Sequence, residues 1–115
     1  EEGKMPKINW DGRTAGNGSW VFERNELKPK SGANSSNTFV FDGKEFKPKI
    51  GGSSSNTFVF DGKEIKPKIG ANSSNTWVVE RDKIKPKTGS NSSNTYDINE
   101  APMAVIIGQL CFRLW

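Results

Sequence analysis

The sequence predicts an all-β protein built from tandem β-hairpins, and three observations support this prediction. The triplet Asn-Thr-aromatic occurs at residues 37–39, 56–58, 75–77 and 94–96, each copy 19 residues after the one before it. From the threonine of the triplet onward, β-branched and aromatic residues alternate, as in Thr38-Phe39-Val40-Phe41, which is typical of strands. An Asp-Gly pair suited to a tight turn follows in two of the copies. A fixed period of this length indicates a repeat architecture.

The chain divides into three parts. Residues 1–19 are expected to form an N-terminal cap, in which Trp10-Asp11-Gly12-Arg13 predicts one extra hairpin turn out of phase with the array. Residues 20–100 carry the 19-residue repeats, and residues 101–115 form an apolar C-terminal segment. Complete repeats begin at Trp20, Phe39, Phe58 and Trp77, and a fifth begins at Tyr96 and breaks off.

Each repeat is interpreted as one hairpin. In the second copy, residues 38–41 form the first strand, Asp42-Gly43 the turn, and residues 44–49 the return strand. This register would place Phe39 opposite Phe46, so that two aromatic side chains share one face of the sheet.

Two copies replace Asp-Gly with other turn residues. Glu23-Arg24-Asn25 and Glu80-Arg81-Asp82 occupy the same place in the repeat. Asn25 and Asp82 are expected to adopt the left-handed backbone conformation, which asparagine and aspartate tolerate best after glycine. A turn is therefore predicted in all four complete copies.

Proline and small polar residues mark where the hairpins end. A proline cannot donate to a strand ladder, so each return strand must end, bulge or lie at an edge near its proline. The connector at residues 31–36 and its relatives are rich in side chains that bond their own backbone, which predicts ordered connectors. The in-phase prolines are Pro29, Pro48, Pro67 and Pro86.

Two architectures fit these elements. Hairpins would form a meander, a hairpin solenoid or a small barrel; alternatively, each repeat would be one coil of a parallel β-solenoid with like residues about 4.8 Å apart. Such stacking would align the lysines of the recurring Lys-Pro-Lys triplet in columns, at a Coulomb cost of about 1 kcal/mol per exposed pair in water. Antiparallel hairpins separate these lysines further, so hairpins are favoured.

The C-terminal segment departs from the repeat. Residues 105–107 predict a strand, Gly108-Gln109 a break, and residues 110–115 a second strand, so the segment is expected to be a capping strand pair. It could also be an assembly strand that completes a neighbouring chain's sheet or core. The expected assembly contacts are Val105, Ile107, Leu110, Phe112, Leu114 and Trp115.

Composition narrows the function classes. Only 32% of the residues are hydrophobic, which predicts a thin core or one completed by a partner. The net charge of +4 comes mostly from the Lys-Pro-Lys triplets, a regular display that is more typical of a solvated face than of a nucleic-acid site. One cysteine and no histidine disfavour a disulfide, a metal site and a cofactor, and the most apolar stretch is too short to span a bilayer.

Catalysis is the weakest hypothesis, because the candidate carboxylates recur identically in successive repeats. An active site needs one convergent, tuned constellation of groups. Asp42, Glu45, Asp61 and Glu64 are better interpreted as turn residues and charge pairs. The sequence therefore predicts no catalytic residue.

The in-phase aromatics offer a binding hypothesis beside their interpretation as core. With asparagine and serine nearby, they could provide one glycan-stacking site per repeat: Trp20, Phe39, Phe58, Trp77 and Tyr96. Here the chain loosely resembles the choline-binding and glucan-binding hairpin repeats of bacterial surface proteins. It lacks their consecutive Trp-Tyr-Tyr aromatics and carries Lys-Pro-Lys, which they do not have.

The repeat style of residues 20–100 also resembles small accessory proteins of bacteriophage virions. That resemblance, the thin core and the apolar C-terminal segment together predict a non-enzymatic structural protein, extracellular or virion-associated. Its expected partners are copies of itself or a larger assembly. A carbohydrate- or surface-binding module is the alternative.

Overall fold

The computed structural model describes residues 5–115, so the first four residues of the expected N-terminal cap lie outside it. Ten strands form one sheet in which every strand pairs with its neighbour in the chain, always antiparallel. The predicted all-β meander of tandem hairpins is confirmed, and the parallel solenoid is wrong. The strands are β1 (Thr14–Ala15), β2 (Trp20–Glu23), β3 (Glu26–Pro29), β4 (Phe39–Phe41), β5 (Glu45–Pro48), β6 (Phe58–Phe60), β7 (Glu64–Pro67), β8 (Trp77–Glu80), β9 (Lys83–Pro86) and β10 (Tyr96–Asp97).

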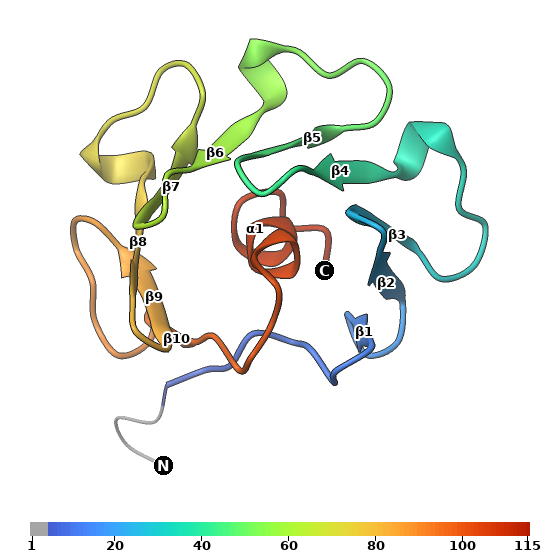
Figure 1. The fold of residues 1–115 in the computed structure, drawn as a ribbon. Helices are drawn as coiled ribbons and strands as arrows, with labels where there is room; N and C mark the ends of the chain where they lie inside the picture. The colour runs from blue at the N-terminus through green and yellow to red at the C-terminus, as the bar shows by residue number, and fades with distance from the viewer. Residues whose placement is uncertain (1–4) are drawn as a thin grey trace.

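The sheet curves around a single helix, α1 (Met103–Leu110), which lies at the centre of the ring of hairpins (Figure 1). The molecule is a flattened disc of 40 × 32 × 19 Å. The sheet is not closed, because β1 and β10 do not pair with each other. Residues 6–10 cross this gap: Ile8 N donates to Asp97 O at 2.9 Å, and Trp10 forms a β-bridge with Ala15.

The prediction of a C-terminal capping strand pair is wrong, because residues 103–110 form α1. The β-branched run at 105–107 suggested a strand, but burial does not alternate there: every residue from Ala104 to Gly108 is buried. A helix that is apolar all round belongs in a core, and a helix satisfies its backbone groups within itself. Tertiary context thus outweighs the β preference of these side chains.

The core forms between α1 and one in-phase position of the repeats. Those repeat residues have no exposed surface: Leu27, Phe46, Ile65 and Ile84. Val105, Ile106 and Ile107 of α1 are equally inaccessible. Each such side chain contributes about 1.5–3 kcal/mol by leaving water. The thin core that composition predicted is therefore completed by the chain's own C-terminal segment.

One glycine lets a strand approach the helix closely. A Cβ atom added to Gly108 would lie 2.6 Å from Cδ2 of Leu27, which is itself fully buried. The expected break at Gly108 is thus a contact point between α1 and β3 rather than the end of an element.

The hairpin register differs from the prediction: each residue of the first strand pairs with a residue two positions further along the return strand than expected. Phe41, not Phe39, lies opposite Phe46, and Phe39 faces Pro48. The cause is Asp42, whose Oδ1 accepts the amides of Lys44 at 2.9 Å and Glu45 at 2.8 Å. Asp42 therefore precedes the turn instead of lying inside it. The rings of Phe39 and Phe46 still stack diagonally, with centroids 5.3 Å apart.

Each return strand ends at its proline, as predicted, and this limits how neighbouring hairpins pair. Between β3 and β4 the ladder covers only two residue pairs. Lys30 N donates back to Ser19 O within its own hairpin, so the alternation of amides points the nitrogen of Pro29 at the next hairpin. Proline has no hydrogen to donate there, and the ladder ends.

The connectors are ordered, as predicted, by a hydrogen-bond network that recurs in full in three copies and in part in the second, where Ser53 replaces the first asparagine. Asn34 Oδ1 accepts the amides of Ser36 and Asn37, Asn37 Oδ1 accepts the amide of Asn34, and Thr38 Oγ1 donates to Asn34 O. These reciprocal bonds cap a single 3₁₀ turn. The 3₁₀ turns are η1 (Ser35–Asn37), η2 (Ser54–Asn56) and η3 (Ser73–Asn75).

Left-handed residues sit in the turns, although not all where expected. Asn25 has φ 67°, as predicted, but in the fourth hairpin the left-handed residue is Arg81, φ 58°, rather than Asp82. Arg81 occupies the repeat position of Gly62, φ 98°. An arginine in this conformation carries steric strain that glycine does not.

Replacing Arg81 with glycine should therefore stabilise the protein. We expect Arg81→Gly to raise the free energy of unfolding by about 1 kcal/mol, because the left-handed strain is removed. The reciprocal variant Gly62→Arg should lower it by a similar amount. Urea unfolding followed by tryptophan fluorescence measures both. Equal stability of both variants and the wild type would contradict this account of the turns.

Candidate binding site

Four of the five in-phase aromatics lie at the proline end of a hairpin, and Tyr96, in the incomplete fifth copy, pairs with Ile84. Trp20 pairs with Pro29, Phe39 with Pro48, Phe58 with Pro67 and Trp77 with Pro86. All five side chains, including Tyr96, are half-buried and pack against the core. They are thus arranged around α1, as core residues that keep some exposed surface.

Residues after α1 cover three of these aromatics. The ring of Trp115 packs 5.7 Å from that of Trp20. Phe112 inserts between two repeats, with its centroid 5.2 Å from Phe39 and 5.3 Å from Phe58. The chain's own C-terminal aromatics therefore occupy the places where a ligand could stack in the first three repeats.

The fourth and fifth aromatics border a hollow instead. Trp77 and Tyr96 pack edge to face, 6.4 Å apart, and line a hollow of about 130 Å³ that is partly open to solvent. The other lining residues come from α1 and the residues after it: Gln109, Leu110, Arg113 and Trp115. Three aromatic rings and two polar side chains thus meet at one point on the surface. We refer to it below as the aromatic hollow.

Gln109 is held in place by two hydrogen bonds to one of its oxygens. Its Oε1 accepts the amide of Asn9 at 2.8 Å and the indole N–H of Trp115 at 3.1 Å. Among residues 5–115, no hydrogen bond involves its Nε2. Both the amide donor and the Trp115 ring are therefore fixed before any ligand arrives, which lowers the entropy cost of binding.

Arg113 is exposed and lies just beyond the end of α1 with φ 52°. Leu114 N donates to Gly108 O at 3.0 Å, which folds the chain back over the helix end. No carboxylate within residues 5–115 forms an ion pair with Arg113. Its guanidinium is available at the rim of the aromatic hollow.

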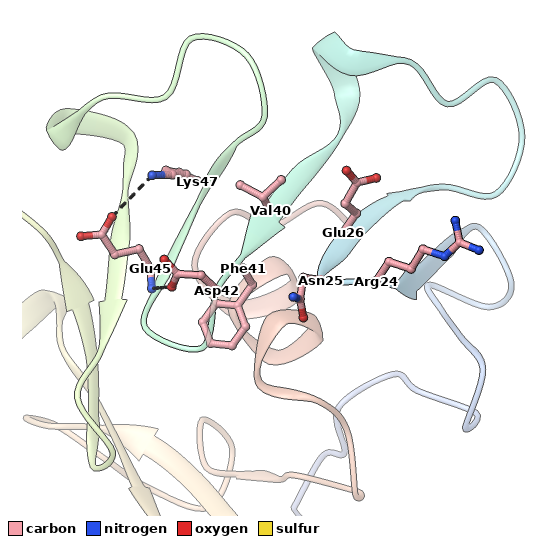
Figure 2. A pocket seen from close by; sticks show the side chains of 8 residues that line it. All are labelled: Arg24, Asn25, Glu26, Val40, Phe41, Asp42, Glu45 and Lys47. Atoms are coloured by element: carbon pink, nitrogen blue, oxygen red, sulfur yellow. Dashed lines mark hydrogen bonds and ion pairs between the residues drawn. The ribbon is translucent and has the colours of Figure 1, made fainter.

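A second hollow of about 160 Å³ lies between the first two hairpin turns (Figure 2). Its floor is Phe41 and Val40, but its carboxylates are already engaged. Asp42 binds the amides of its own turn, while Glu26 and Glu45 pair with lysines of the next repeat. Figure 2 shows Arg24 extending away from Phe41. The carboxylates of this hollow are engaged within the fold and it contains one aromatic ring, so it is the weaker candidate.

The Lys-Pro-Lys triplets are paired with glutamates rather than forming unpaired columns. In three of the four triplets the second lysine reaches the glutamate of the preceding repeat: Lys49–Glu26 at 2.8 Å, Lys68–Glu45 at 2.8 Å and Lys87–Glu64 at 3.0 Å. We call these three pairs the glutamate ladder. In the fourth repeat, which no further triplet follows, the glutamate position is Lys83. The charged residues of this face thus join neighbouring hairpins.

The candidate carboxylates of the sequence serve these structural roles. Backbone amides lower the pKa of Asp42 and of Asp61, and hydrogen bonds from Lys68 and Lys87 lower the pKa of Glu45 and of Glu64. All four are therefore held ionised, two in each of two successive repeats. This arrangement is that of turn and ladder residues.

The expected assembly contacts lie within the chain's own fold. Val105 and Ile107 are inaccessible and Leu110 is 7% exposed. Phe112, Leu114 and Trp115 are half-buried against the same core. This placement serves the capping role. A role for these side chains in contacts with another chain stays a prediction.

Cys111 lies next to α1, where burial raises the pKa of its thiol to about 12. At neutral pH it is a thiol, the poorly nucleophilic form. Within residues 5–115 no three His, Cys, Asp or Glu side chains cluster as metal ligands would, and no helix has the length and apolar character needed to cross a bilayer.

Sequence reasoning found only part of the aromatic hollow. Trp77, Tyr96 and Trp115 were among its candidates, but Gln109 and Arg113 were not. The available signal was that these two are the polar, hydrogen-bonding residues of the otherwise apolar stretch 103–115.

No protein-family model matches the chain, and no similar protein was found among curated sequences or solved structures.

The glutamate ladder predicts a loss of stability in acid. Hydrogen bonds from lysine hold the pKa of Glu26, Glu45 and Glu64 below the ordinary value of 4.5. As the pH falls, the unfolded chain therefore binds protons first, so the ladder's contribution is complete above about pH 5 and declines below it. We expect the urea concentration at the unfolding midpoint of the wild type to be lower at about pH 3 than at about pH 5. In the triple variant E26Q/E45Q/E64Q this decrease should be smaller.

The single variant Glu100→Gln is the control, because it removes a carboxylate outside the ladder. It should keep the acid dependence of the wild type. An unchanged acid dependence in the triple variant would show that the ladder does not contribute.

Proposed function

We propose that this chain is a non-enzymatic carbohydrate-binding module. The observation that carries the proposal is the aromatic hollow, where Trp77, Tyr96 and Trp115 meet the side-chain amide of Gln109. The features that favoured assembly are satisfied within the chain: α1 fills the core, and residues 6–10 pair at both ends of the sheet.

The chemistry of the aromatic hollow suits a sugar ring. A sugar presents an apolar C–H face beside a rim of hydroxyl groups, and aromatic rings combined with a few fixed polar groups match that mixture. The hollow, about 130 Å³, is smaller than the pockets that enclose whole small-molecule ligands, so it suits one sugar ring that stays partly exposed. A single sugar residue, free or at the end of a chain, is the proposed ligand.

The matched variants use the same position of two repeats. Trp77→Leu and Phe58→Leu both shorten an in-phase aromatic, but Trp77 borders the hollow whereas Phe58 is covered by Phe112. We expect the wild type to bind members of a glycan array, Trp77→Leu to weaken that binding at least about tenfold, and Phe58→Leu to leave it unchanged.

Circular dichroism and thermal unfolding establish that both variants are folded. A folded wild type that binds no glycan on the array would refute the proposal. Equal weakening by the two variants would remove the aromatic hollow as its site.

Assembly is a second candidate function, favoured by one specific observation. Ile50 and Ile69 occupy the same position in successive connectors and are 60% and 56% exposed. The connectors project outward from the ring in Figure 1. Burial of each side chain against a partner would contribute about 1.5–3 kcal/mol. In this proposal the connectors join copies of the chain or attach it to a larger extracellular particle such as a phage virion.

Light scattering coupled to size-exclusion chromatography tests this candidate. We expect the wild type to show a mass above that of the 12.7 kDa monomer at high concentration, and the double variant I50S/I69S to remain monomeric. The variant Ser31→Ile, which adds an isoleucine at the same position of the first repeat, should associate more strongly. A wild type that stays monomeric at every concentration would contradict self-association.

A further inference from the structure

We propose that the ligand of the aromatic hollow is a sugar that carries an anionic group, a carboxylate or a sulfate, and that Arg113 binds this group. The inference rests on the proposed function and adds the ligand's charge to it. It comes from three properties of Arg113: its place at the hollow, its lack of an ion-pair partner, and its backbone conformation.

Arg113 is placed where it can act together with the aromatic rings. It lines the same hollow as Trp77, Tyr96 and Trp115, and none of the six lining residues is acidic. A guanidinium group there faces no competing carboxylate side chain from the hollow itself, and it forms no ion pair with the α-carboxylate of Trp115. Its planar fork matches the two oxygens of a carboxylate or sulfate, a geometry that a lysine cannot offer.

The unpaired state of Arg113 contrasts with the lysines of the outer face. There, the second lysine of three triplets pairs with a glutamate at 2.8 to 3.0 Å. Within residues 5–115 no acidic side chain forms such a pair with Arg113. In the same part of the chain Arg13, Arg24 and Arg81 form no ion pair either, so what distinguishes Arg113 is its place beside three aromatic rings. The net charge of +4 favours the approach of an anion.

The backbone of Arg113 indicates that the fold alone does not call for arginine. With φ 52°, it adopts the left-handed conformation three residues after α1 ends, as Arg24 and Arg81 do in the hairpin turns. Glycine would reverse the chain without steric strain and would still let Leu114 bond to Gly108 and Trp115 pack on Trp20.

Matched sugars test the inference directly. Isothermal titration calorimetry would compare the methyl glycosides of glucose and galactose with those of glucuronic and galacturonic acid, which differ only at C6. We expect the acid of at least one pair to bind the wild type at least about tenfold more tightly than its neutral partner. This preference should shrink as NaCl is raised, because exposed ion pairs are screened.

Variants of Arg113 separate charge from shape. Arg113→Gln should abolish the preference for the acid while the neutral glycoside still binds, and Arg113→Lys should restore part of it. Arg113→Gly should also abolish the preference, yet raise the unfolding midpoint because the strain is relieved. Arg81→Gly is the matched control: it relieves the same strain in a distant turn and should leave the preference intact.

Each result decides between the two proposals. Equal affinity for neutral and acidic glycosides would overturn the inference about Arg113 and leave carbohydrate binding standing. If no pair binds, both fail. Preference for the acid that survives Arg113→Gln would also overturn the inference. Sodium sulfate that displaces the acidic glycoside at equal concentration would show a site for a simple anion and overturn the sugar component.

Discussion

The packing of the hairpins against α1 is the interaction on which the rest of the structure depends. Each complete repeat supplies one fully buried side chain to the centre, and the connectors and turns are too polar to supply more. A hairpin with so small an apolar face is not stable alone. The helix gives all the repeats a common surface, so a chain with only 32% hydrophobic residues can still form one continuous core.

Repetition and departure from repetition have different roles here. The recurring residues build the frame: Asp42 and Asp61 set the turns, asparagines cap the connectors, and the glutamate ladder joins neighbouring hairpins. These polar groups form their hydrogen bonds and ion pairs with nearby residues of the repeats. The aromatic hollow lies where the fourth and fifth repeats meet the non-repeating segment, and only such a junction could bring together the side chains of Trp77, Gln109 and Arg113.

The sequence predicted the parts of the fold that are local. The hairpins, the strand ends at proline and the ordered connectors follow from residues close together in the chain. The helix did not, because Val105, Ile106 and Ile107 favour strands and their burial on all sides depends on repeats far away in sequence. The predicted register was wrong because the carboxylate of Asp42 accepts backbone amides of the turn, which places Asp42 before the turn rather than within it. For the aromatic hollow, the stacking residues could be proposed from the repeat, whereas Gln109 and Arg113 could not be placed without the helix.

The burial of α1 among all the hairpins has a consequence for folding. In stacked solenoids each repeat contacts only its neighbours, so folding can start anywhere and spread. Here the interior surface of every hairpin stays exposed until residues 103–110 are in place, and the closing contacts span the chain: Asn9 meets Gln109, and Ile8 meets Asn99. Long-range contacts of this kind slow folding and make it cooperative. A protein that is periodic in sequence therefore behaves as one indivisible unit, which gains and loses its structure as a whole.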